Sequence, residues 1–66
     1  MSVPTSADVF RQLIHNLREA QSNCAMLAHI TRDDDAVRSH GWLAMSELLG
    51  RAVHNVTELA TRRRLQ

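Results

Sequence analysis

The chain has few of the residues that cross-link a fold or interrupt its secondary structure. Its 66 residues include one cysteine, one proline, two glycines and no tyrosine or lysine. A single cysteine cannot form an internal disulfide, which excludes small disulfide-stapled secreted domains. No apolar run approaches the ~18–20 residues that span a membrane, and the first residues lack the basic and apolar regions of a signal peptide. We therefore expect one cytoplasmic domain with no membrane partner.

The first half of the chain has the pattern of one long helix. Alanine, leucine, arginine and glutamine are frequent in it, and these residues favour helix. Thr5 is followed three residues later by Asp8, which fits a capping box, although Ser6 is an alternative N-cap. No helix-breaking residue occurs before about Thr31. We predict a helix over residues 6–31.

A polar turn and a second helix follow. We predict the turn over residues 32–35, where Asp33 or Asp34 would cap the next helix and further carboxylates would suit its positive end. The second helix is predicted over residues 36–63. Glycine inside a helix costs about 1 kcal/mol relative to alanine, so Gly41 is the expected site of a kink.

Both helices carry apolar residues at heptad spacing, which is typical of coiled-coil packing. The repeat in the first helix consists of Phe10, Leu13, Leu17, Ala20, Cys24 and Leu27. The repeat in the second consists of Trp42, Met45, Leu49, Ala52, Val56 and Leu59. A reversal at the turn makes the helices antiparallel, so that residues whose numbers sum to about 66, such as Leu17 and Leu49, face one another.

The predicted fold is therefore an all-α, two-helix antiparallel hairpin that dimerises into a four-helix bundle. Flanking apolar residues make each stripe broader than a two-helix seam needs. A chain of this length buries only ~60% of its unfolded surface, so a second copy or another protein has to cover the remainder. The second helix is apolar on more than one side near its middle. The residues that we expect at dimer or partner contacts are Met26, Trp42, Leu43, Met45 and Leu48.

The side chains that could bind a metal or act in catalysis are explained more simply by structural roles. The histidines lack the spacing of a helical zinc site, and His15 and His54 each lie four residues before a glutamate, as in surface pairs. Cys24 falls in the apolar repeat, where a thiol behaves as a small hydrophobic group. No glycine-rich phosphate loop, nucleophile elbow or pair of buried carboxylates is recognisable. We predict a non-enzymatic protein with no metal, no cofactor and no small-molecule substrate.

Three consecutive arginines, Arg62, Arg63 and Arg64, support an alternative. They raise the local positive potential and could contact RNA or DNA phosphates, together with Arg11 and Arg18. Against this, the whole chain carries a net charge of only +1, and cations also suit the end of a helix. The alternative to a protein-binding function is thus a nucleic-acid-binding hairpin dimer.

Residues 13–20, 42–43 and 48–52 are similar to a family of small helical-hairpin proteins of Pseudomonas phages and related bacteria, which includes phage quorum-sensing anti-activators. The resemblance covers about residues 9–64. It implies a homodimeric hairpin that inhibits a host regulator or motor protein by occupying its surface, with Leu43 and its neighbours as contacts. We therefore expect a protein-binding regulator or inhibitor of a host or cellular protein, such as a transcriptional regulator.

Overall fold

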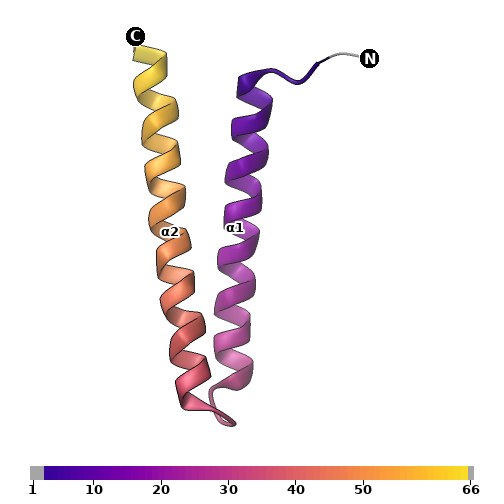
Figure 1. Ribbon diagram of the computed structural model, residues 1–66, viewed down its shortest axis with the longest axis vertical. Coiled ribbons are helices and arrows are strands. Elements are labelled where there is room, and N and C mark those ends of the chain that lie inside the picture. Colours follow the sequence, from indigo (N-terminus) through magenta and orange to yellow (C-terminus); the bar gives the residue numbers. More distant parts are fainter. Residues whose placement is uncertain (1–2, 66) are drawn as a thin grey trace.

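Two antiparallel helices joined by a tight turn form the described part of the chain (Figure 1). The structure is a computed structural model that describes the backbone of residues 3–65 and the side chains of residues 3–62. Helix α1 spans Ser6–Thr31 and helix α2 spans Ala36–Leu65. The predicted all-helical class with two helices is confirmed. The bounds of α1 coincide with the prediction, and α2 starts where expected but ends two residues later.

A capping box begins α1. The Thr5 hydroxyl accepts a hydrogen bond from the Asp8 backbone N–H at 3.2 Å, and the Thr5 N–H donates to the Asp8 carboxylate at 3.2 Å. Thr5 is therefore the N-cap, and Ser6 is the first residue of the helix. Asp8 also accepts a hydrogen bond from Arg11 at 2.8 Å. The reciprocal pair satisfies two backbone donors that the first turn leaves free.

This cap makes stability depend on pH. The pKa of Asp8 is lowered from its ordinary value, chiefly by the hydrogen bond from the Thr5 backbone, then by the Thr5 side chain and by Arg11. A carboxyl group whose pKa is lower in the folded state stabilises the fold above its unfolded value of ~3.9, and this contribution is lost as the pH falls through the folded value. We expect Asp8→Asn to lose less thermal stability than the wild type between about pH 5 and about pH 2.5. Circular-dichroism melts across this range test the expectation, and identical acid dependence in both proteins would contradict it.

The turn differs from the prediction in its capping residue. The N–H groups of Asp34 and Asp35 both donate to the Thr31 carbonyl, at 3.2 and 2.9 Å. This tight turn leaves Asp35 immediately before the first residue of α2, and its carboxylate accepts from the Arg38 N–H at 3.1 Å. Asp35 therefore caps α2, and the assignment of this role to Asp33 or Asp34 was wrong. Beyond the turn, α2 runs through Gly41 as continuous helix.

The seam between the helices repeats every seven residues and keeps most of the predicted residues, with Ala20 and Ala52 half-buried at its edge. On α1 the buried and half-buried repeat consists of Phe10, Ile14, Leu17, Gln21, Cys24, Ala28 and Thr31. On α2 it consists of Ser39, Trp42, Ser46, Leu49, Val53, Val56 and Ala60. The prediction was wrong for Leu13, Leu27, Met45 and Leu59, which are between 38% and 58% exposed. These four side chains lie beside the seam.

Two serines of α2 lie between the helices and bond to the backbone of α1. The Ser39 hydroxyl donates to the Ala28 carbonyl at 2.7 Å, and the Ser46 hydroxyl donates to the Gln21 carbonyl at 3.3 Å. Each serine thus satisfies its hydroxyl against the opposite backbone while occupying little volume, so the helices can approach closely. Figure 1 shows α1 and α2 converging toward the turn and separating toward the chain ends. A side chain as large as Met45 at these positions would hold the backbones apart.

The hairpin is a single layer of helices with very little core. Its extents are 47 × 29 × 10 Å, and its radius of gyration is 15.4 Å, whereas a compact chain of this length has about 11 Å. The exposed area of 5623 Å² also exceeds the roughly 4,200 Å² typical of a compact 7.5 kDa protein. Among the described residues, only Ala28 and Ser39 are buried. Stable domains typically pack at least two layers around a core, whereas the described hairpin forms one layer.

Candidate interaction surfaces

Exposed apolar residues line one side of the seam. Each of them immediately precedes a seam residue in the sequence: Val9, Leu13, Leu27 and Ile30 on α1, and Met45, Leu48 and Leu59 on α2. In an antiparallel pair of right-handed helices, the residues that precede the seam residues lie on the same side of the pair. These seven residues therefore lie on one side of the hairpin, which we call the apolar face.

The opposite side of the hairpin is polar and rich in basic groups. The exposed residues that immediately follow seam residues include three arginines and all four histidines, but only one acid: Arg11, His15, Arg18, His29, Arg32, His40, Glu47 and His54. Leu43 lies among them and is 48% exposed. We call these nine residues the polar face. The polar face combines the hydrogen-bond donors of arginine and histidine with one large apolar side chain, that of Leu43.

The five predicted contact residues fall into three groups. Met45 and Leu48 belong to the apolar face, and Leu43 belongs to the polar face. Met26 is 58% exposed and points away from the seam on the outer side of α1. Trp42 is half-buried in the seam and packs within the hairpin itself. The sequence reasoning missed Val9, Leu13, Leu27, Ile30 and Leu59 as candidate contacts, because several were assigned to the seam.

Two arginines of the predicted nucleic-acid patch, Arg11 and Arg62, lie toward the end of the hairpin that holds the chain ends. Arg62 is exposed in the last turns of α2, whereas the side chains of Arg63 and Arg64 lie outside the described residues. Arg11 is held by the Asp8 carboxylate at 2.8 Å near the start of α1. Arg18 is exposed on the polar face.

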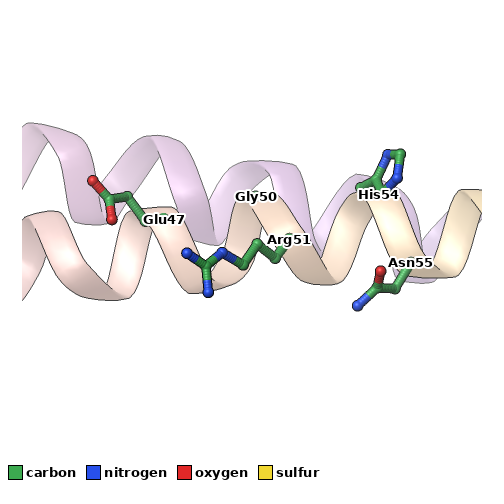
Figure 2. Close-up of a pocket in the computed structure, with 5 residues that line it drawn as sticks. All are labelled: Glu47, Gly50, Arg51, His54 and Asn55. Carbon is green, nitrogen blue, oxygen red and sulfur yellow. The ribbon is translucent and has the colours of Figure 1, made fainter.

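A shallow depression lies on the outer surface of α2 (Figure 2). It measures about 450 Å³, and its lining residues are Glu47, Gly50, Arg51, His54 and Asn55. Gly50 also packs against α1, where an added Cβ would meet the Gln21 amide nitrogen at 2.9 Å. Figure 2 shows His54 and Asn55 leaving α2 toward different sides of the hairpin. Because its polar side chains are all exposed, the depression lacks the enclosure typical of a small-molecule site.

Two of the histidines pair with glutamates on their own helix. His15 Nε2 lies 3.7 Å from the Glu19 carboxylate, and His54 Nε2 lies 3.6 Å from the Glu58 carboxylate, with all four side chains largely exposed. Within the described residues, no three potential metal ligands come together. Cys24 is a free, half-buried thiol in the seam. Over the same residues, neither helix has a stretch long and apolar enough to span a membrane.

Comparison with protein families, curated proteins and solved structures finds no match for this chain.

Proposed function

We propose that this chain is a non-enzymatic, homodimeric helical hairpin that regulates or inhibits another protein by occupying part of its surface. The proposed target is a host or cellular protein, such as a transcriptional regulator. The observation that supports this proposal is the presence of two unlike exposed surfaces on one layer of helices. The apolar face is suited to an obligate interface, whereas the polar face is suited to a transient interface with another protein.

The area of exposed surface supports the dimer. Two separate hairpins expose twice 5623 Å², whereas a compact protein of twice this mass exposes about 7,000 Å². Association would therefore have to remove about 4,000 Å² from water, which lies within the roughly 2,000–5,000 Å² buried by obligate homodimers. A second copy that covers the apolar face would also give the four-helix bundle its second layer.

The polar face supports binding to a protein with an acidic surface. Its arginines and histidines lie on the same side of the hairpin as Leu43, and the face itself includes one carboxylate, Glu47. Four of these basic residues also have a carboxylate within 4 Å on their own helix or in the turn: Arg11, His15, Arg32 and His54. In an interface, a central apolar side chain surrounded by charged groups supplies buried area, while the charges steer association and select the partner. The complementary surface would have an apolar recess bordered by Asp or Glu side chains.

Leu43→Asp tests this function. The substitution places a negative charge at the centre of the polar face, far from the apolar face, so we expect helix content and dimer mass to be unchanged. Tagged wild type and Leu43→Asp are incubated with the same bacterial extract. We expect a protein that stays with the wild type, is lost with the variant, and forms a stoichiometric complex after purification and remixing.

Two results would contradict the proposal. A wild-type solution mass of 7.5 kDa by light scattering at micromolar concentration would eliminate the homodimer. If the only retained ligand is nucleic acid, released by nuclease and by moderate salt, the nucleic-acid-binding alternative replaces the protein-binding one. Replacing Arg62, Arg63 and Arg64 by glutamine would then weaken that binding.

A further inference from the structure

Along the α1 part of the apolar face, the order of residue types is nearly the same in both directions. Along the residues that precede the seam, the order is Val9, Leu13, Asn16, Ala20, Asn23, Leu27 and Ile30. Reversing this order about Ala20 exchanges each residue with one of the same kind: a β-branched residue with a β-branched residue, leucine with leucine, and asparagine with asparagine. A surface that is symmetric under reversal is complementary to an antiparallel copy of itself, which is the requirement of a two-fold symmetric interface.

The α2 part of the face has a matching centre. Leu48 occupies the middle of its stripe, and reversal about Leu48 exchanges Met45 with the smaller Ala52. Farther from the centre it exchanges Gly41 with Asn55 and Arg38 with Leu59, so the symmetry of the α2 stripe is confined to its middle. The two hydrogen bonds across the seam pair residues whose numbers sum to 67, which places Leu48 at nearly the same level of the hairpin as Ala20. One two-fold axis can therefore pass through the centres of both stripes.

From this symmetry we infer that two copies pack through their apolar faces with their turns at opposite ends, α1 against α1 and α2 against α2. This inference rests on the proposed homodimer and specifies its arrangement. Val9 then meets Ile30 of the second copy, and Leu13 meets Leu27. Two alanines at position 20 lie on the axis, where their small size lets the α1 helices approach closely.

The asparagines specify this arrangement. In the opposite-end dimer, Asn16 lies against Asn23 of the second copy, so two amide pairs can exchange hydrogen bonds inside the interface. In the other symmetric arrangement, with both turns at one end, α1 lies over α2 of the second copy. Asn23 would then face Met45, and Leu13 would face Asn55. Each of those contacts sets an amide against an apolar side chain and leaves its polar atoms without a partner, which is costly.

Cysteine cross-linking distinguishes the two arrangements. Ala20→Cys is introduced into a Cys24→Ser chain, and its helix content and solution mass are checked first. Position 20 meets its own copy only in the opposite-end dimer, so we expect oxidation to give a covalent dimer. Ser22→Cys is the control on the other side of α1. We expect cross-linking at position 20 to be about a thousandfold faster, because thiols held within one dimer have an effective concentration near millimolar rather than micromolar.

A second pair of variants makes the result independent of position 20. Chains with Leu13→Cys and chains with Leu27→Cys, again with Cys24→Ser, are mixed and oxidised, and we expect covalent heterodimers. If the solution mass is dimeric but Leu13→Cys chains cross-link instead with Asn55→Cys chains, the opposite-end arrangement is wrong and the proposed dimer survives. A monomeric mass would overturn the dimer itself.

Discussion

Replacing Leu48 by aspartate is expected to abolish the dimer. Leu48 is 55% exposed in the hairpin and lies at the centre of the apolar face. In the proposed bundle, the substitution buries two carboxylates near the two-fold axis, where they repel one another and lose their hydration. A penalty of about 4 kcal/mol would weaken association about a thousandfold. Light scattering across a concentration series measures this loss.

We expect helix content to fall together with the dimer. The separate hairpin has almost no buried core among its described residues, and most of the stability of helices in proteins comes from tertiary packing. Circular dichroism of Leu48→Asp at micromolar concentration should therefore show a less helical chain than the wild type.

Leu43→Asp is the matched control for this experiment. It makes the same chemical change at a similarly exposed leucine, 48% against 55%, on the opposite side of α2. We expect it to keep the dimer mass and helix content. Equal loss of the dimer in both variants would show that the apolar face is not the dimer interface.

The second large effect is expected in the seam, where Leu17→Ala and Leu49→Ala should each destabilise the fold. Both leucines are half-buried in the seam, one helical turn from the hydrogen bond between Ser46 and Gln21 on the side of the chain ends. Removing a leucine side chain from a packed site costs ~2–5 kcal/mol, and we expect the lower end because these sites are partly exposed. A loss of about 2 kcal/mol lowers the melting temperature of so small a protein by roughly 10 °C.

Thermal unfolding followed by circular dichroism measures this effect at fixed protein concentration, since association contributes to stability. Leu43→Ala serves as the control, because it removes the same atoms from an exposed site on the polar face. Its melting temperature should stay within a few degrees of the wild type. If Leu17→Ala and Leu49→Ala behaved like this control, the seam would not be the structural core of the hairpin.

The sequence by itself determined the helices. The reciprocal bonding of Thr5 and Asp8 is a local property of four residues, so the capping box and the start of α1 follow from sequence alone. The scarcity of glycine and proline and the aspartates after Thr31 likewise define the turn and the beginning of α2. The heptad spacing also indicated that each helix carries a broad apolar stripe.

Only the tertiary structure decided which residues of each apolar stripe lie in the seam and which lie beside it. The predicted seam took in the largest apolar residues, including Leu13 and Met45, because hydrophobic periodicity weighs residues by their apolar character. The folded hairpin instead places Ser39 and Ser46 between the helices, where their hydroxyls bond to the opposite backbone and their small volume permits close approach. Leu13, Leu27, Met45 and Leu59 lie one position to the side of the seam, whereas Phe10, Leu17, Trp42 and Leu49 remain in it. Distances between helices depend on side-chain size and on partners distant in sequence, which a pattern along one helix does not contain.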